Sequence, residues 1–405
     1  MWLFWRKNIE RGGKKLFLSG RIVSLELSKT MELNSRAMEL QSKGEKVIRL
    51  TAGEPDIKTP DSIIEAAYLA MKSGKTKYTD NRGILELRKK ISDYVNNKYH
   101  ANYNENNVIV TNGGKQAIFN ALFSIINPSD EIIIFDPSWV SYDSQIKMLE
   151  GVPVHIKCYE ENNFLPLEED IEKAITNKTK AIIINSPNNP TGIVYPKSLL
   201  ELIVSLSIKH NLLIISDEVY DCLLYDHSYT SMASFNEIKD RLVVVNSFSK
   251  AWSMTGWRVG YALAPEEIIN QMAKIQSHST SNVNTPSQYA ALKALSVDNS
   301  FMIEEFQKRR DFLFDEFKKL NLKFVKPQGA FYYFINISEF GLNDIQFCDR
   351  LLEYGLAVVP GSAFYADGYI RLSFAASFNE LVEATNILKR FFRDIRDRRH
   401  AFNEN

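Results

Sequence analysis

Several short polar segments interrupt apolar runs in this sequence and carry residue types that could do chemistry. Lys250 ends the segment Ser-Phe-Ser-Lys that follows the apolar run 242–246, and Arg258 comes eight residues later. An amine that is buried near other cations has a lowered pKa, and the neutral amine is a nucleophile for carbonyl groups. By itself such a lysine is more often a surface residue, so its role depends on its surroundings.

Asp217 ends another apolar run, 212–215, and lies between Ser216 and Glu218. A carboxylate at the end of a buried strand requires a partner, because an unpaired buried charge is costly. An ion pair, a helix cap and a functional cation all remain open as that partner.

Two polar loops follow further apolar runs. Thr-Asn-Gly-Gly-Lys at 111–115 leads into an expected helix, 115–126, whose N-terminus and glycine N–H groups favour an anion. The dinucleotide fingerprint GxGxxG is absent, so this loop suits a phosphate monoester, with a simple turn as the alternative. In the loop 185–192, two prolines fix the backbone around Asn189 and make its amide a well-positioned donor.

Arg371 lies between apolar neighbours in the expected strand 370–374. Its planar guanidinium matches the geometry of a carboxylate, so a substrate carboxylate is one candidate partner. A structural ion pair is the alternative.

Taken together and in this order, these segments resemble the class I pyridoxal-phosphate aminotransferases of fold type I. Within that family they are most similar to the bacterial aspartate and aspartate–prephenate aminotransferases. The resemblance covers about residues 20 to 395. It rests on the following residues and segments: 50–56 (LTAGEPD), Tyr78 with Gly83, 113–115 (GGK), 136–139 (DPSW), 189–192 (NPTG), 216–220 (SDEVY), 247–250 (SFSK) and Arg371.

The resemblance implies a role for each residue around pyridoxal 5′-phosphate. Lys250 would hold this cofactor as a Schiff base and move the substrate proton, and Asp217 would keep the pyridine nitrogen protonated. Tyr220 and Asn189 would bind the 3-oxygen of the ring, and Trp139 would pack on the ring. The residues implied to hold the phosphate are Gly113, Gly114, Ser247, Ser249, Arg258 and, from a second subunit, Tyr78.

The resemblance also implies the substrates, which are small amino acids and 2-oxo acids. Arg371, with the N–H of Gly53 and with Asn189 and Trp139, would bind the substrate's α-carboxylate end. Lys115 would bind the distal carboxylate of aspartate or glutamate, with 2-oxoglutarate or oxaloacetate as acceptor in a ping-pong reaction. A solvated lysine is the alternative for Lys115. Because Tyr78 would reach the neighbouring subunit's cofactor, a homodimer with shared active sites is expected.

Thr30 suggests a second activity, the transamination of prephenate to arogenate. The segment 28–31 resembles that of prephenate-using relatives, in which a threonine and a lysine at the positions of Thr30 and Lys115 line the distal side of the pocket. Some of those relatives have a lysine where this chain has Glu26, and a carboxylate facing the pocket there would repel a dianion. The alternative is that Thr30 only caps the helix expected to begin near Met31.

The elements that position these residues alternate between strands and helices. Near-continuous apolar runs separated by helices indicate a mostly parallel sheet covered on both faces, and hence an α/β fold. The expected strands are 108–111, 131–136, 181–185, 212–217 and 242–246, with helices at 115–126 and 196–210. In such sheets ligands bind at the carboxyl ends of the strands, where the polar segments lie.

The last hundred residues predict a smaller α+β domain. They contain expected helices at 300–320, 342–354 and 381–397, an aromatic strand 331–334 within the segment 325–337, and the strand 370–374. The expected division is a disordered leader 1–18, a segment 19–57 that joins the small domain, a large cofactor-binding domain 58–300, the small domain 301–397 and a tail 398–405.

Composition excludes several other classes of protein. The 405 residues include 49 Lys plus Arg and 49 Asp plus Glu, and a neutral chain is a poor general binder of nucleic acid. No apolar run approaches the roughly 18 residues of a membrane helix, and the five apolar residues 1–5 precede the charges that a signal peptide would place first. Three widely spaced cysteines predict neither a disulfide framework nor a zinc site, so a cytoplasmic protein without a metal is expected.

The sequence leaves several alternative functions to be weighed against an aspartate aminotransferase. A cofactor-sensing regulator would need a separate DNA-binding domain, and a nucleotide-dependent dehydrogenase would need the missing glycine fingerprint. A lyase or decarboxylase is a third alternative, against which Arg371, Asn189 and Trp139 favour transamination. Aromatic or alanine specificity is the alternative within the aminotransferases.

Overall fold

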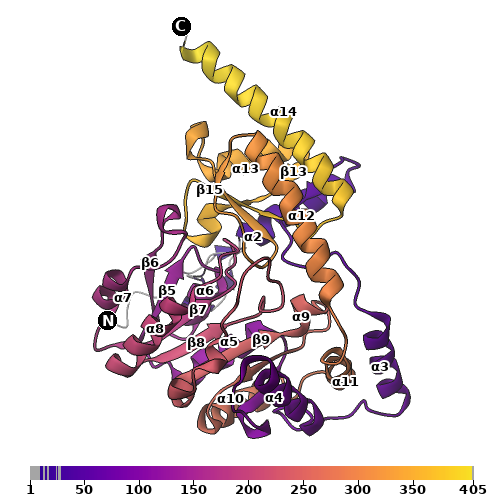
Figure 1. Ribbon diagram of the computed structural model, residues 1–405, viewed down its shortest axis with the longest axis vertical. Coiled ribbons are helices and arrows are strands. Elements are labelled where there is room, and N and C mark those ends of the chain that lie inside the picture. The colour runs from indigo at the N-terminus through magenta and orange to yellow at the C-terminus, as the bar shows by residue number, and fades with distance from the viewer. Residues whose placement is uncertain (1–9, 12–13, 16–17, 24, 26–28, 404–405) are drawn as a thin grey trace.

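A seven-stranded sheet in the order β4-β10-β9-β8-β7-β5-β6 forms the centre of the larger part of the protein (Figure 1). The computed structural model describes residues 10–11, 14–15, 18–23, 25 and 29–403. The strands are β4 (Val108–Thr111), β5 (Glu131–Asp136), β6 (Val152–Lys157), β7 (Thr179–Asn185), β8 (Leu213–Asp217), β9 (Leu242–Ser247) and β10 (Gly260–Leu263). The five strands expected from the apolar runs are all present, which confirms the α/β fold class.

Strand β10 is the antiparallel exception, since it runs against both β4 and β9 while the other pairs are parallel. A parallel neighbour would need a crossover of a dozen or more residues, usually a helix. The link from β9 to β10 contains only the four-residue helix α9 (Phe248–Ala251), which is too short to serve as a crossover helix along the sheet, and the chain turns back. This turn holds Lys250 at the carboxyl end of β9.

Alternating side chains of each strand feed two apolar layers, one on each face of the sheet. In β5, Ile132 and Ile134 pack with the layer that contains Ile118 of α5, whereas Ile133 and Phe135 pack with the opposite layer. Burying such a side chain stabilises the fold by about 2 kcal/mol, so the register of the sheet is strongly specified. Helices that contribute to the first layer are α5 (Gly114–Ile125), α6 (Ser141–Met148) and α10 (Glu266–Ser279). Helices that contribute to the second are α4 (Leu85–Tyr99), α7 (Glu168–Ala174), α8 (Lys197–His210) and α11 (Thr285–Ala294), with α3 (Asp61–Lys72) beside α11.

A four-stranded antiparallel sheet in the order β11-β12-β15-β14 lies above the first sheet in Figure 1. Its strands are β11 (Lys323–Phe324), β12 (Tyr332–Asn336), β14 (Val359–Pro360) and β15 (Tyr369–Ser373). The helices of this part are α12 (Ser300–Lys319), α13 (Asp344–Glu353) and α14 (Phe378–Asn403), and they share a separate apolar core with the sheet. The aromatic strand expected at 331–334 lies at 332–336, and the closing helix runs six residues beyond the expected 397.

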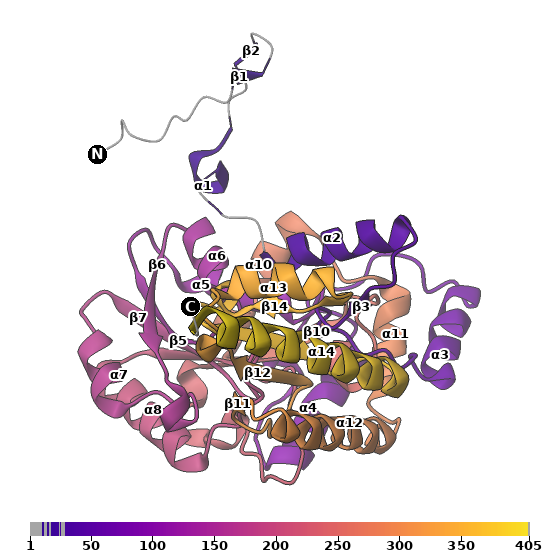
Figure 2. The same cartoon turned by 90° about the horizontal axis from the view of Figure 1, so that it is seen from above.

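The N-terminal segment packs against this second core. Strand β3 (Ile48–Arg49) pairs in parallel with β13 (Leu356–Ala357), and α2 (Lys29–Ser42) lies beside α13 (Figure 2). Arg36 of α2 forms a 2.6 Å ion pair with Asp349 of α13. The remaining strands and α-helix of the described residues are the short strands β1 (Glu10–Arg11) and β2 (Lys14–Lys15) and the one-turn helix α1 (Gly20–Val23), and short 3-10 helices connect several elements.

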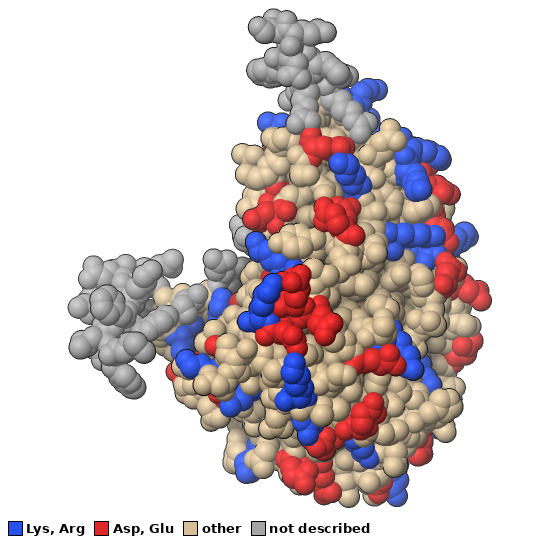
Figure 3. Space-filling view, turned by 60° about the vertical axis from the view of Figure 1, so that its left-hand side comes forward, with Lys and Arg blue, Asp and Glu red and all other residues tan. Residues whose placement is uncertain are grey.

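Charges of both signs are intermingled on the face shown in Figure 3, without a single-sign patch. No helix among the described residues is long and apolar enough to cross a membrane. The described part of the chain also holds no group of three or more His, Cys, Asp or Glu residues arranged as metal ligands.

Candidate active site

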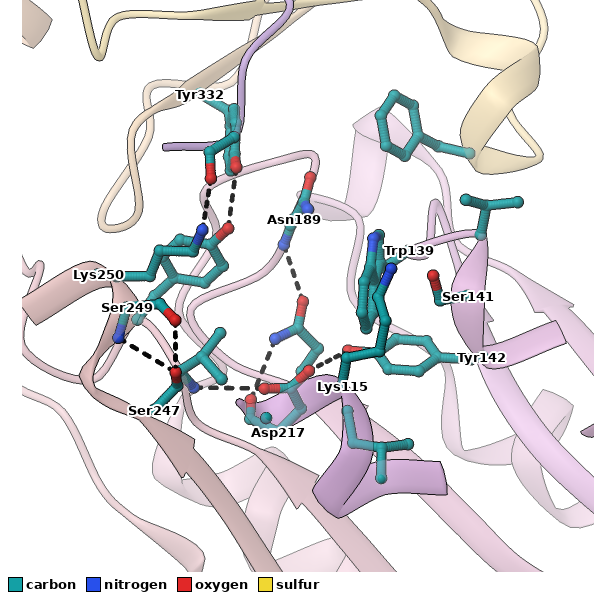
Figure 4. A pocket seen from close by; sticks show the side chains of 18 of the residues that line it. Lys115, Trp139, Ser141, Tyr142, Asn189, Asp217, Ser247, Ser249, Lys250 and Tyr332 are labelled. Carbon is teal, nitrogen blue, oxygen red and sulfur yellow. Dashed lines mark hydrogen bonds between the residues drawn. The ribbon is translucent and has the colours of Figure 1, made fainter. Parts of the chain in front are cut away.

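One cavity of about 440 Å³ lies at the carboxyl ends of the central strands, beneath the four-stranded sheet (Figure 4). It brings together most of the residues that the sequence singled out. The predicted residues that line it are Gly53, Gly114, Lys115, Trp139, Asn189, Asp217, Tyr220, Ser247, Ser249, Lys250, Arg258 and Arg371. They come from both sheets and from the loops between them, so the cavity exists only in the assembled fold.

Lys250 projects into this cavity from α9. Its Nζ donates a hydrogen bond to the backbone oxygen of Gly53. Burial lowers the pKa of Lys250 to about 8, with Arg258 and Arg371 acting in the same direction and Glu54 opposing them. A substantial share of the amines is therefore neutral near pH 8, as nucleophilic attack on a carbonyl requires.

Asp217 ends β8 as a buried carboxylate and is only 3% exposed. The Tyr142 hydroxyl donates a 2.6 Å hydrogen bond to Asp217, and the Val219 N–H donates another of 3.3 Å. Burial raises the pKa of Asp217 to about 6 despite these donors. Among the described residues no Lys, Arg or His forms a salt bridge with it, so a bound cation such as a protonated pyridine nitrogen would satisfy it.

A cradle of anion-binding groups lies at the end of the cavity near Arg258. The Ser247 hydroxyl donates to Ser249 Oγ over 2.8 Å, and both side chains line the cavity. Gly113 has a φ of +80°, and a Cβ there would lie 2.7 Å from Arg258 Nη2. The bare backbone lets the guanidinium approach the N-terminus of α5, where unpaired N–H groups favour a phosphate.

Arg371 lies on β15 in the opposite wall and is 3% exposed. Its Nη1 donates to Asn189 Oδ1 over 2.9 Å and its Nη2 to the Thr51 oxygen over 2.8 Å. Its buried Nε has no hydrogen-bond partner, and no carboxylate of the described residues pairs with the guanidinium. The alternative of a structural ion pair is therefore wrong within the described chain, and the group has spare capacity for a ligand carboxylate.

Lys115 and Trp139 form a third side of the cavity. Lys115 Nζ lies 4.8 Å from the centre of the Trp139 ring. Burial, with help from Arg258, lowers the pKa of Lys115. The cavity thus holds a second amino group in addition to that of Lys250. Lys115 lies on α5 and Trp139 lies just before α6, whereas Arg371 comes from β15.

Several residues of the cavity were not predicted. Tyr142 lies three positions after Trp139, which could have indicated its place on the same wall. The Tyr332 hydroxyl lies 2.8 Å from that of Tyr220, and the Tyr332 ring lies 4.3 Å from the Arg371 guanidinium carbon. Only the aromatic run 331–334 pointed to Tyr332. Phe364 lines the cavity from the end of a short 3-10 helix (Gly361–Phe364), which carries no sequence signal.

Two predicted residues, Tyr78 and Gly113, do not line the cavity of this chain, and two others lie where the structure does not describe the side chain. Tyr78 is 88% exposed and does not line the cavity. Thr30 lies in the first turn of α2, one residue after the helix begins, and its side chain lies outside the described residues. Glu26 lies outside the described residues altogether. Gly113 does not line the cavity but contacts it through Arg258.

These groups together fit pyridoxal 5′-phosphate. The buried carboxylate of Asp217, which has no salt-bridge partner among the described residues, suits a pyridinium. The amine of Lys250 suits the aldehyde, and the cradle at Arg258 suits a phosphate monoester. The Arg371 guanidinium, which lines the cavity without a carboxylate partner among the described residues, adds a place for a substrate carboxylate.

Comparisons with known proteins point the same way. The family profile described as aminotransferase class I and II matches residues 45–386. The aspartate aminotransferase of Thermotoga maritima is 48% identical over 375 residues, which cover 92% of this chain and 99% of that protein. The aspartate/prephenate aminotransferase of Thermus thermophilus is 41% identical, covering 93% and 98%.

A solved structure gives the same relationship in three dimensions. The Thermus thermophilus aspartate aminotransferase with maleate has a TM-score of 0.90 and 40% identity, covering 93% of this chain and 99% of that one. Sequence identity of 40–48% over nearly the whole length of both chains shows common family membership and not only a common fold. The chain belongs to the class I and II aminotransferases, enzymes that depend on pyridoxal 5′-phosphate.

Proposed function

We propose that this aminotransferase transfers the amino group of L-aspartate or L-glutamate to 2-oxoglutarate or oxaloacetate by a ping-pong route. The observation that carries this proposal is the pair of cationic side chains in one cavity, Arg371 on β15 and Lys115 on α5. Two cations on different walls suit the two carboxylates of a dicarboxylic amino acid. The Thermus relative solved with maleate, itself a dicarboxylate, supports the same substrate class.

Asp217, Tyr220, Asn189 and Trp139 would hold the ring of the cofactor. Its phosphate would lie against Gly113, Gly114, Ser247, Ser249 and Arg258. Bound pyridoxal 5′-phosphate supplies an electron sink for negative charge at the substrate Cα. Asp217 keeps the sink effective, because its carboxylate stabilises the protonated pyridine nitrogen.

Lys250 would take the proton from the substrate Cα and return it later in the reaction. Its lowered pKa of about 8 suits both roles, since the amine accepts the proton and the ammonium returns it. Arg371 would bind the α-carboxylate with its guanidinium, while Gly53 and Asn189 complete that end. Lys115 binds the distal carboxylate.

Substrate competition tests the proposal. Lys115→Ala is expected to lower kcat/KM for aspartate and glutamate by about tenfold or more, because it removes one charge-assisted contact. The same change should leave kcat/KM for alanine almost unaffected. An equal loss for all three amino acids would contradict the assignment of Lys115 to the distal carboxylate.

A homodimer completes the proposed site. The α3 face carries exposed Ile64, Tyr68 and Leu69, each about half exposed, and Tyr78 follows that helix. A hollow next to Arg258, lined also by Trp257 and Asn284, lies outside the cavity and offers a place for the partner subunit's Tyr78. Sedimentation of the purified protein should give a dimer, and a fully active monomer at assay dilution would contradict it.

Prephenate is the second candidate substrate. The Thermus relative named aspartate/prephenate aminotransferase supports it, as does the presence of Lys115 in the cavity. Thr30→Val is expected to lower kcat/KM for prephenate selectively, with oxaloacetate as the reference acceptor. Undetectable turnover of prephenate by the unaltered enzyme would rule this activity out.

We also propose the division into a large unit 58–300 and a small unit formed by 19–57 with 301–397. The separate apolar core beneath the four-stranded sheet supports it. A cytoplasmic location is proposed as well, and the free thiols of Cys158, Cys222 and Cys348 suit a reducing compartment.

A further inference from the structure

His155 lies on β6, outside the cavity, between two carboxylates. Its Nδ1 is 2.8 Å from Asp136 Oδ2 and its Nε2 is 3.1 Å from Asp143 Oδ1. Asp136 is the last residue of β5, and Asp143 lies in the first turn of α6. Both carboxylate side chains are buried, at 3% and 7% exposure, whereas the imidazole is 25% exposed. One side chain thus connects two points of the chain seven residues apart.

The segment 136–143 between these carboxylates carries part of the cavity wall. Trp139 lines the cavity, and Tyr142 donates the hydrogen bond to Asp217 (Figure 4). Within the segment, Ser138 Oγ donates to Asp136 Oδ1 over 2.6 Å, and the Ser138 N–H donates to the Phe364 oxygen over 3.2 Å. A displacement of either end of the segment would therefore move groups that face the cavity.

The charge state of His155 suits a link between two carboxylates. Burial alone would lower the pKa of His155, but the hydrogen bonds and charges of Asp136 and Asp143 outweigh burial and raise this pKa to about 9. Lys147 shares Asp143 at 2.9 Å, and the Tyr365 ring lies 4.4 Å from the imidazole ring. A neutral imidazole has only one N–H, so it would leave one of the carboxylates facing a lone pair.

We propose that His155 is a positioning residue of the cofactor site, which as an imidazolium joins the two ends of segment 136–143 and so fixes Trp139 and Tyr142. The inference rests on the proposed function, in which Trp139 and Asp217 hold pyridoxal 5′-phosphate. His155 touches neither substrate nor cofactor. It acts on the ring position through Trp139 and on the Asp217 carboxylate through Tyr142.

His155→Gln tests this inference, with Lys157→Gln as the matched control. Lys157 is an exposed cation on the same strand, so the control removes the same charge without altering the link. Titration of the cofactor-free protein with pyridoxal 5′-phosphate should give a Kd about tenfold higher for His155→Gln, the effect of one lost charge-assisted hydrogen bond. The Kd of Lys157→Gln should match that of the unaltered protein.

A spectroscopic readout separates positioning from general stability. At saturating cofactor, the visible circular dichroism band of the bound cofactor should weaken in His155→Gln, because the band reports a fixed orientation of the ring against its neighbours. Lys157→Gln should keep the band. If His155→Gln shows a lower melting temperature with an unchanged Kd and an unchanged band, the positioning role is overturned.

Asp143→Asn provides a second variant that preserves side-chain shape. Its Kd should rise in the same direction, and the effects of His155→Gln and Asp143→Asn should be less than additive in the double variant, since both act through one link. Full additivity would overturn the inference. An unaltered protein that does not bind pyridoxal 5′-phosphate would instead contradict the proposed function from which the inference starts.

Discussion

Replacing Tyr142 with Phe tests whether Asp217 depends on a single strong donor. The Tyr142 hydroxyl approaches Asp217 Oδ2 to 2.6 Å, and the second donor, the Val219 N–H, is longer at 3.3 Å. Phe keeps the ring and its edge-on contact with Trp139, whose centre is 5.3 Å away. The substitution therefore removes the hydrogen bond and little packing.

The size of the effect follows from the charge of the acceptor. A hydrogen bond to a charged group contributes about 1.5–3 kcal/mol, roughly twice the value for a neutral pair. The bond favours ionised Asp217, so its loss should raise the Asp217 pKa above the present value of about 6. A rise of about one unit corresponds to about 1.4 kcal/mol between the two protonation states.

The sign of the pH dependence is therefore defined. Above the Asp217 pKa, the carboxylate is ionised and misses the donor, so Tyr142→Phe should lower the free energy of unfolding most at pH 8. At pH 5 the group is protonated in both proteins, and the loss should be smaller by about 1.4 kcal/mol. Urea denaturation of the cofactor-free protein at both pH values measures this difference.

Tyr195→Phe is the matched control, since Tyr195 is also buried but does not line the cavity. Its effect on the free energy of unfolding should not differ between pH 5 and pH 8. A Tyr142→Phe loss that is the same at both pH values would refute the claim that this hydroxyl stabilises the ionised form of Asp217.

Further predictions concern other parts of the site. Lys250→Ala should abolish transamination and the visible absorbance of the lysine-linked cofactor, and near-normal turnover would contradict the role of Lys250. In the cofactor-free protein, the rate at which Lys250 reacts with added pyridoxal 5′-phosphate should rise with pH through about 8 as the amine loses its proton, which the growth of the visible absorbance measures. Gly113→Ala should weaken cofactor binding by about tenfold, because its Cβ would meet Arg258 and its φ of +80° disfavours alanine. Arg371→Lys should lower kcat/KM by about a hundredfold through loss of the guanidinium fork, with Kd for the cofactor unchanged.

Residues at the ends of apolar strands were predictable from the sequence. Asp217 and Lys250 each interrupt a buried run, and a parallel sheet brings the ends of such runs to one edge. Both line the cavity. This pattern is local in the sequence, because an apolar strand and the polar residues that follow it lie within about ten residues of each other.

The contacts made across the fold were not predictable in this way. Tyr332 reaches Tyr220 from 112 positions away, and Phe364 enters the cavity from a short 3-10 helix between β14 and β15. His155 has no neighbours in sequence that would suggest two carboxylate partners, since Asp136 lies 19 positions earlier. Such contacts are determined by how the two apolar cores pack, and no local periodicity encodes that arrangement.

The cavity lies between two separate apolar cores, and this gives its ligands a mechanical role. Asp217 and Ser247 end strands of the seven-stranded sheet, whereas Arg371 belongs to the four-stranded sheet. A substrate that binds Arg371 while its other end contacts the cofactor or Lys115 connects the two cores. Opening of the smaller core alone would then break the contacts of the bound substrate, so the free energy of that local opening increases with ligand concentration. Amide hydrogens of β12 and β15 should consequently exchange more slowly when a dicarboxylate spans the gap, although the ligand touches few of them.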